Sequence, residues 1–369
     1  HLLKPLGYRV GLTGKVHVKP KEAFPFQKVP GFDPSCVREP TKPHDLSGTK
    51  NFITADPAKP FCLVVALTEP HAPWVMGDAS QYPPSKLQLP SYLADTPMTR
   101  EYFAKYLAEI TYMDSQVGEL LALLDETKLA DNTLVLFTSE QGAPHLPFGG
   151  KWTCWDHGLK TALIARLPGT IKPGTRTNAM VQYIDIVPTL IDIAGGDART
   201  ADTGIDHPTK DTRGFDGISF ANVLTGKANT HRDTVYGIQT TNGIINGSKS
   251  YPIRSIRDKQ WLMIWNLNAD NEPFQNIFHG RDAGYWEDWR EAAKQDPAIA
   301  KRVAFYQERP TFELYDIEAD PHQLKNLADD PEHAELLREM HTKLQTWMKS
   351  QGDEGLTSEA KAKQRQGNK

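Results

Sequence analysis

The sequence has few cysteines, no long apolar run and no cluster of basic residues. Its three cysteines, Cys36, Cys62 and Cys154, are an odd number without Cys-x-x-Cys spacing, which argues against a zinc site or a dense disulfide framework. No apolar run approaches the roughly 18 residues needed to span a bilayer. The formal net charge of -4 is small and the basic residues are scattered. We therefore expect unpaired thiols, no membrane span and no nucleic-acid partner.

Length and composition indicate an ordinary folded chain. Hydrophobic residues make up 39% and charged residues 24% of the sequence, close to the average of globular proteins. A chain of 369 residues is too long for one small core, so we expect a large domain with a smaller companion. Its first residues, HLLKPLGYRV, contain neither an initiator Met nor a secretory signal pattern.

Three short apolar runs predict the strands of a sheet. Residues 61–67 (FCLVVAL), 133–138 (TLVLFT) and 161–167 (TALIARL) indicate strands buried on both faces of a largely parallel sheet. Between the first two, residues 101–126 carry apolar side chains at spacings of three and four, which predicts an amphipathic crossover helix. Asp114 falls on its apolar stripe, and a buried carboxylate needs a partner, so we expect a paired structural residue, with a functional one as the alternative. The pattern predicts an α/β fold with a mainly parallel sheet flanked by helices.

The last third of the chain has a different pattern of apolar and polar residues. From about residue 250, YPIRSIRDKQWLMIWN and TFELYDIEADP indicate exposed antiparallel strands and turns. We expect a large α/β domain over 1–245, a smaller C-terminal α+β domain with an antiparallel sheet over 246–354, and a polar, disordered tail over 355–369. Two long loops, 19–60 and 268–310, are expected to carry binding residues.

Lys15 and His17 are the first candidates for chemistry. They lie two residues apart in GYRVGLTGKVHVKP, and in an extended segment their side chains would share a face. Lysine neutralises the charge of an oxyanion and histidine transfers a proton, so the pair suits an anionic ester. The alternative is that both are exposed surface residues without a function.

His71 follows the apolar run 61–67 in the sequence TEPHAPW. Open α/β sheets bind their ligands beyond the carboxyl ends of the strands. Prolines on both sides would hold the imidazole in a fixed loop, as a group that protonates a leaving group requires. A structural histidine in a proline-rich turn is the alternative.

Glu140 and Gln141 follow the next apolar run in the same way. A carboxylate and an amide oxygen suit a hard cation such as Ca²⁺ or Mg²⁺ but make only part of its shell, and a helix cap or loop is the alternative. Lys151, on the glycine-flanked segment GGK, would reach a bound anion, or is a solvated surface charge.

Together and in this order, these segments resemble the sulfatase family of the alkaline-phosphatase-like superfamily. The segment GYRVGLTGKVHV resembles the family's GY-then-GKWH signature, TEPHAPW its PH-x-P loop, and FTSEQG its strand ending in an acidic-amide or acidic-histidine pair. GGKWTCWDHGLKTALIARLPG resembles the following GK segment. Four further segments match downstream: YIDIVPTLIDIAGG, GFDGISFANVLTG, YPIRSIRDKQWLMIWN and FELYDIEADPHQLKNLADDP. The resemblance covers essentially the whole chain.

The resemblance implies a role for each candidate. Lys15 and Lys151 would hold the sulfate oxygens, and His17 would assist the nucleophile. His71 would bind the substrate and protonate the leaving oxygen or nitrogen. Glu140 and Gln141 would be calcium ligands in place of the more usual Asp followed by Asn or His, each one methylene longer.

The resemblance also implies a formylglycine nucleophile, made from the Cys of a C-x-P-S-R motif by a formylglycine-generating enzyme. The sequence has no such motif, and Cys36 in PSCVREP lies downstream of Lys15 without the Pro-Ser-Arg that should follow. We expect residues 1–245 to be a sulfatase catalytic domain lacking its N-terminal portion, and this fragment to be inactive alone. The family implies a periplasmic or secreted location.

Two alternatives stay open. A phosphate or phosphonate ester hydrolase of the same superfamily would reuse the sheet and the metal, although GKVH and GGK favour sulfate. A noncatalytic protein that binds calcium or an anion would account for a missing nucleophile. The resemblance implies a sulfated sugar or polysaccharide as substrate, with O-sulfate and N-sulfate both open.

Overall fold

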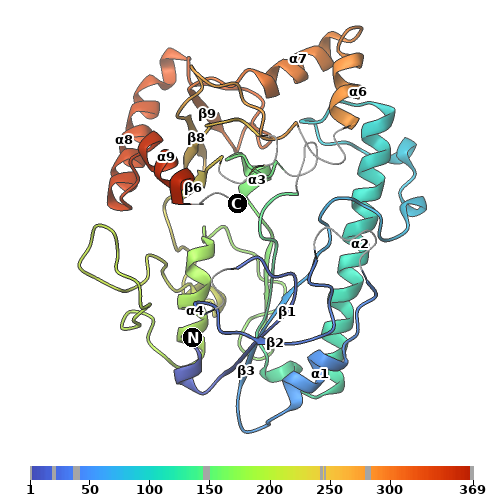
Figure 1. Ribbon diagram of the computed structural model, residues 1–369, viewed down its shortest axis with the longest axis vertical. Helices are drawn as coiled ribbons and strands as arrows, with labels where there is room; N and C mark the ends of the chain where they lie inside the picture. The colour runs from blue at the N-terminus through green and yellow to red at the C-terminus, as the bar shows by residue number, and fades with distance from the viewer. Residues whose placement is uncertain are drawn as a thin grey trace. The chain divides into compact units, whose positions relative to one another are not determined.

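The computed structural model describes residues 2–18, 22–35, 42–143, 150–241, 244, 247–278 and 284–365 (Figure 1). The chain forms two compact units, each built from segments distant in sequence. The first comprises His1–Gln81, Lys105–Phe137 and Ile164–His231, and the second Tyr82–Ala104, Thr138–Leu163 and Arg232–Lys369. The second unit thus takes two stretches from the domain that we expected over 1–245. Cys36 lies outside the described residues.

A parallel sheet organises the first unit. Strand β1 (Arg9–Gly14) pairs in parallel with β2 (Gln27–Lys28) on one side and with β3 (Phe61–Ala66) on the other. The pairing of β1 with β3 runs from Arg9 opposite Phe61 to Gly14 opposite Ala66, so both strands end at the same edge. This confirms the mainly parallel sheet that the sequence predicts.

Helices cover the sheet on both faces. Successive side chains of a strand point to opposite faces. Leu63 of β3 packs into a core with α1 (Ser47–Thr54) and the C-terminal end of α2 (Pro97–Glu126). Its neighbour Cys62 packs into a second core with α4 (Ile186–Ile193). Figure 1 shows α4 and α2 on opposite sides of β1 and β3.

The predicted burial of the strands on both faces is only partly observed. Strands β4 (Val135–Thr138) and β5 (Leu163–Arg166) form a two-stranded sheet, and their side chains are half-buried except for Ile164, which is 62% exposed. Strand β3 is likewise half-buried, with Val64 41% exposed. Among the described residues β3 lies at the edge of its sheet, so it lacks the neighbours that would cover a central strand.

Helix α2 confirms the predicted amphipathic helix, but among the described residues the strands before and after it, β3 and β4, lie in separate sheets, and the helix buries a different carboxylate. Asp114, expected on the buried stripe, is exposed. Glu109 is 2% exposed, and Ala104 and Ala108 on the same stretch are also buried. The expectation for Asp114 was wrong because the segment after β3 packs on the side of the helix that carries Ala108 and Glu109.

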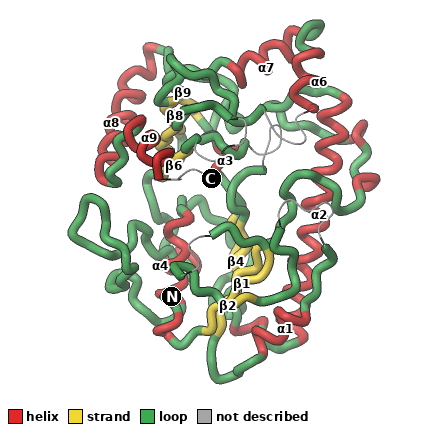
Figure 2. The backbone as a smooth tube through the Cα atoms, in the orientation of Figure 1, coloured by secondary structure: helices red, strands yellow, loops and turns green. Residues whose placement is uncertain are grey.

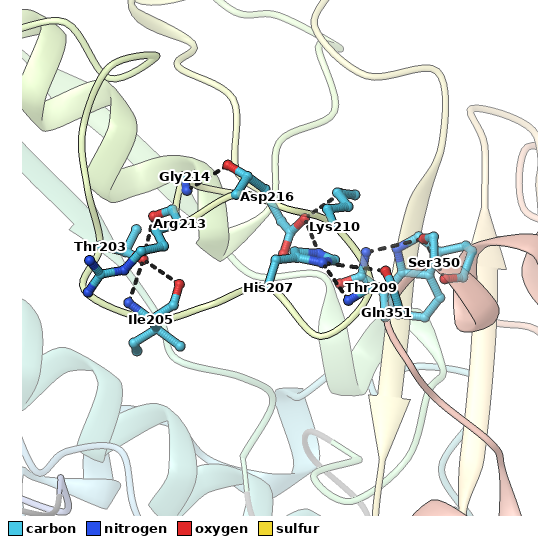
Figure 3. A network of polar contacts seen from close by, with 12 residues as sticks. Thr203, Ile205, His207, Thr209, Lys210, Arg213, Gly214, Asp216, Ser350 and Gln351 are labelled. Carbon is cyan, nitrogen blue, oxygen red and sulfur yellow. Dashed lines mark hydrogen bonds and ion pairs between the residues drawn. The ribbon is translucent and has the colours of Figure 1, made fainter.

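A long loop of the first unit is held by polar side chains rather than by helix or strand. His207 Nδ1 accepts a hydrogen bond from the Thr209 N–H at 3.1 Å, so its Nε2–H donates to Asp216 Oδ1, also at 3.1 Å. Lys210 donates to the same carboxylate oxygen at 3.0 Å (Figure 3). Short helical turns complete the first unit: η1 (Lys4–Leu6), η2 (Ala79–Gln81), η4 (Ala130–Asn132), η5 (Tyr183–Asp185) and α5 (Ala221–Leu224).

An antiparallel sheet organises the second unit, as predicted for the C-terminal region. The order is β6-β7-β8-β9, and the strands are β6 (Val235–Gln239), β7 (Ile253–Arg257), β8 (Trp261–Asn266) and β9 (Phe312–Asp316). Ile256, Met263 and Leu314 lie opposite one another on three neighbouring strands. They pack against Met340, Leu344 and Met348 of α8 (Ala334–Ser350), which recur every four residues and so line one helix face. Figure 2 shows α8 beside these strands.

The remaining helices of the second unit bury many aromatic side chains. They are η3 (Pro84–Lys86), α3 (Asp156–Leu159), α6 (Gly284–Ala292), α7 (Pro297–Gln307), η6 (Pro331–His333) and α9 (Leu356–Arg365). Tyr285, Trp286 and Trp289 of α6 are at most 4% exposed, so they belong to the core rather than to a sugar-binding surface.

The tail expected to be disordered forms α9. Its Glu359 is 5% exposed and accepts a hydrogen bond from the Thr241 N–H at 2.9 Å, which ties the helix to a residue 118 positions earlier. Among the described residues, no helix has the length and apolar character needed to cross a bilayer.

Candidate active site

Lys15 and His17 emerge where β1 ends beside β3. Gly14 has a φ of +84°, and a Cβ there would lie 2.1 Å from the Ala66 carbonyl oxygen, so only glycine allows the two strand ends to approach this closely. The Lys15 N–H then donates to that carbonyl at 2.8 Å. Lys15 is half-buried and His17 is exposed. Both therefore follow the carboxyl edge of the parallel sheet, a placement that the sequence analysis did not predict because it assigned no strand to residues 9–14.

His71 lies in the segment that leaves the same edge from β3. Its backbone N–H donates to the Thr68 carbonyl at 3.0 Å, and its Nδ1 lies 2.6 Å from the Ala72 carbonyl oxygen. Because a carbonyl oxygen only accepts, Nδ1 must carry the hydrogen of this bond. In the protonated ring, Nε2 therefore carries the proton that can be transferred.

The segment that carries His71 is anchored on helix α2. The indole of Trp74 packs edge-on against Tyr106, with 5.5 Å between the ring centroids, and its Nε1–H donates to the Pro70 carbonyl at 3.2 Å. Gly77 has a φ of +75°, and a Cβ there would lie 2.2 Å from the Ala108 carbonyl oxygen. The segment is therefore in tight contact with the helix over several residues.

Glu109 is the residue of this region that sequence reasoning missed. Its Oε2 accepts a hydrogen bond from the Met76 N–H at 2.7 Å. Burial raises the pKa of the Glu109 carboxyl to about 8, hydrogen bonds from the Met76 and Val75 backbone oppose this shift, and the nearby charge of Glu69 adds to it. Glu109 lies next to the expected apolar stripe of α2, which is the only hint in the sequence. That position does not tell which side of the helix another segment will cover.

Glu140 and Gln141 follow β4 as predicted and belong to the second unit. Glu140 is exposed and Gln141 is half-buried. The Ser139 hydroxyl donates to the Gln141 carbonyl at 2.9 Å, and the Gly142 N–H donates to the Gly158 carbonyl at 2.9 Å. These bonds fix the turn that presents a carboxylate and an amide oxygen.

Lys151 lies close to that turn in the same unit. Its backbone N–H donates to the Ala143 carbonyl at 3.2 Å, and its Nζ lies 5.5 Å from the centroid of the Trp152 ring. Gly150 precedes it with a φ of +57°, and a Cβ there would lie 2.3 Å from the His157 ring. Glycine at this position lets the Lys151 segment pack directly on the half-buried His157.

A cluster of polar and aromatic side chains packs next to the segment that carries Lys151. Burial, together with the charges of Arg309 and His322, lowers the pKa of His157 to about 3, so the ring is neutral. His157 stacks on Trp155, and the guanidinium of Arg309 lies 4.0 Å from the centroid of the Trp155 ring. The indole Nε1–H donates to Glu313 Oε2 at 3.0 Å.

The structure therefore brings the predicted residues into two groups. Lys15, His17 and His71 share one edge of the parallel sheet in the first unit. Glu140, Gln141 and Lys151 lie on two hydrogen-bonded turns in the second. The described part of the chain has no cluster of three or more His, Cys, Asp or Glu residues spaced to hold a metal ion.

Comparison with known proteins decides the family. Residues 1–196, more than half of the chain, match the sequence profile of the family described as Sulfatase. The chain belongs to the sulfatase family. A second profile, N-sulphoglucosamine sulphohydrolase, C-terminal, matches residues 147–280 and 293–350 of the chain.

Individual relatives agree with this assignment. The chain is 30% identical to an ulvan-active sulfatase of Formosa agariphila over 95% of its length, and it spans 64% of that relative's length. It is 26% identical to human N-sulphoglucosamine sulphohydrolase, over 94% of the chain and 72% of the human protein. A solved complex with D-glucosamine-2-N,6-O-disulfate superposes with a TM-score of 0.65 at 18% identity, covering 96% of this chain and 82% of that one. The superposition confirms the predicted fold.

Proposed function

We propose that this member of the sulfatase family hydrolyses sulfate groups on carbohydrates. The single observation that carries the proposal is the fixed imidazole of His71, whose Nδ1 is bonded to the Ala72 carbonyl at the carboxyl edge of a parallel sheet. Ulvan and N-sulphoglucosamine, which appear in the names of two relatives, support a sulfated sugar as the substrate.

In the proposed reaction the nucleophile bonds to sulfur as the S–O or S–N bond to the sugar breaks, and His71 delivers its Nε2 proton to the leaving oxygen or nitrogen. The sulfate is then released, and water restores the nucleophile. Protonation of the leaving group by a positioned side chain accelerates such reactions by about 10²–10⁴-fold. Lys15 and Lys151 bind oxygens of the sulfate group and offset the negative charge that grows on them. His17 assists the nucleophile.

The nucleophile that we propose is a formylglycine, installed by a formylglycine-generating enzyme. Glu140 and Gln141 are the proposed calcium ligands among the described residues. Their oxygens are the donors that Ca²⁺ prefers, but two residues supply fewer than the six to eight oxygens of its shell. When bound, Ca²⁺ would supply Lewis-acid stabilisation of the sulfate charge. A periplasmic or secreted location belongs to the same proposal.

The proposal is tested with the full-length protein, coexpressed with a formylglycine-generating enzyme. Sulfate release is measured on ulvan fragments, N-sulfoglucosamine and glucosamine 6-sulfate, with phosphate and phosphonate esters of sugars as the comparison. Release from at least one sulfated sugar, with little turnover of the phosphorus esters, supports a sulfatase. Preferential turnover of phosphorus esters supports the phosphohydrolase alternative, and calcium binding without any turnover supports a noncatalytic binding protein.

A further inference from the structure

We infer that Glu109 is a positioning residue for His71, acting as the hydrogen-bond acceptor that fixes the His71 segment on helix α2. This inference rests on the proposed function of His71 as the proton donor. It goes beyond that proposal because Glu109 is distinct from the residues proposed to contact the substrate or the calcium ion.

The contacts between the segment and the helix lead to Glu109. Trp74 packs against Tyr106, and Gly77 lies so close to Ala108 that no Cβ fits. Both contacts are apolar or steric, and they are less directional than a hydrogen bond. The bond of 2.7 Å from the Met76 N–H to the Glu109 carboxyl is directional, so it fixes the register of the segment on the helix.

That register determines where the imidazole lies. His71 is five residues before Met76, and the intervening chain is held by the Trp74 indole bonded to the Pro70 carbonyl. Movement at Met76 is therefore transmitted to both sides of His71. A displacement of about 1 Å at a catalytic group can lower a rate about 10²-fold.

A carboxyl group at this place also carries a cost that an apolar residue would avoid. Glu109 is 2% exposed and lies near the buried Glu69, which is 5% exposed. Burying an ionisable group is unfavourable unless its bonds compensate. An apolar side chain at position 109 would avoid this cost, but it could not accept hydrogen bonds from the backbone of residues 75–76.

Two variants separate the acceptor from the rest of the side chain. Glu109→Gln keeps the length of the side chain and an oxygen acceptor. Glu109→Met keeps the length and the burial, but its thioether sulfur is only a weak acceptor. Leu123→Ala is the matched control, because it opens a cavity in the core on the same helix without touching the His71 segment. His71→Ala tests the proposed function separately.

The kcat and KM for the sulfated sugar that the full-length enzyme turns over are measured for all four variants, with thermal melting as the stability readout. We expect Glu109→Met to lower kcat at least about tenfold with KM within about twofold, and Glu109→Gln to stay within about threefold of wild type. Leu123→Ala should melt at a lower temperature than Glu109→Met yet keep its kcat.

A structural role alone would give the opposite order, with kcat following the melting temperature across the variants. That result overturns the inference, as does a Glu109→Met enzyme with wild-type kcat or a Glu109→Gln enzyme as slow as Glu109→Met. If His71→Ala keeps full activity, the proposed function fails instead. The two failures are therefore distinguishable in one set of measurements.

Discussion

Glu69 and Glu109 are two buried carboxyl groups in the first unit, and the charge of Glu69 helps to raise the pKa of Glu109 to about 8. Tyr112, one helical turn after Glu109, also lies within the influence of both carboxyls, and its own pKa is raised by burial and then by the charge of Glu69. At neutral pH Glu109 is therefore mostly protonated. It then both accepts from the Met76 N–H and carries a hydrogen that it can donate.

Glu109 should make the protein less stable as the pH rises from about 4.5 to about 8. In the unfolded chain the carboxyl loses its proton near its ordinary pKa of 4.5, whereas in the folded protein it keeps the proton until about pH 8. Between these values the unfolded state binds fewer protons, so raising the pH favours unfolding, and above about pH 8 the effect is constant. Urea denaturation of wild type and Glu109→Gln measures it.

The free energy of unfolding of Glu109→Gln minus that of wild type should grow between about pH 4.5 and about pH 8 and then level off. Other groups titrate in both proteins and cancel in the difference. A difference that is the same at pH 5 and pH 8 would show that Glu109 titrates near its ordinary value.

Gly77→Ala should displace the His71 segment, because the added Cβ would lie 2.2 Å from the Ala108 carbonyl and the φ of +75° is unfavourable for alanine. We expect a loss of about 1–3 kcal/mol in stability and a lower kcat. Gly118→Ala on α2 is the control, because nothing lies within 4 Å of its Cβ position. That change should stabilise the helix by about 0.5–1 kcal/mol. Equal effects of the two substitutions would contradict the close packing described here.

Glu313 and Arg309 should behave as a coupled pair in the second unit. They form an ion pair with side chains only 1% and 4% exposed, and Glu313 also accepts from Tyr315 and Asn266. Glu313→Gln leaves the Arg309 charge buried without a counter-charge, at an expected cost of about 3–5 kcal/mol. Adding Arg309→Met should recover about 0.5–3 kcal/mol of that loss. Urea denaturation of the single and double variants measures the coupling, and strictly additive losses would argue against it.

The sequence predicts those parts of the fold that depend on local periodicity. The apolar runs at 61–67 and 133–138 are long enough to identify strands, and the apolar residues at spacings of three and four identify α2. The rule that open α/β sheets bind ligands beyond the carboxyl ends of their strands predicts the position of His71 after residues 61–67. No strand was predicted before Lys15, so its place at the same sheet edge comes from the structure.

The sequence does not predict features that depend on which distant segment covers a surface. Glu109 is buried because residues 74–77 pack on its side of α2, and periodicity within the helix selected Asp114 instead. The polar composition of 355–369 suggested disorder, yet α9 forms, with Glu359 bonded to Thr241. Both errors arise from tertiary contacts that override local pattern.

The most direct test of the central claim is sulfate release by the full-length protein carrying His71→Ala, beside wild type and His333→Ala, which replaces a histidine outside the proposed site. Wild type and His333→Ala should release sulfate from a sulfated sugar at similar rates, and His71→Ala should be slower by about 10²–10⁴-fold while folding normally by circular dichroism. A His71→Ala protein that releases sulfate at the wild-type rate would contradict the account.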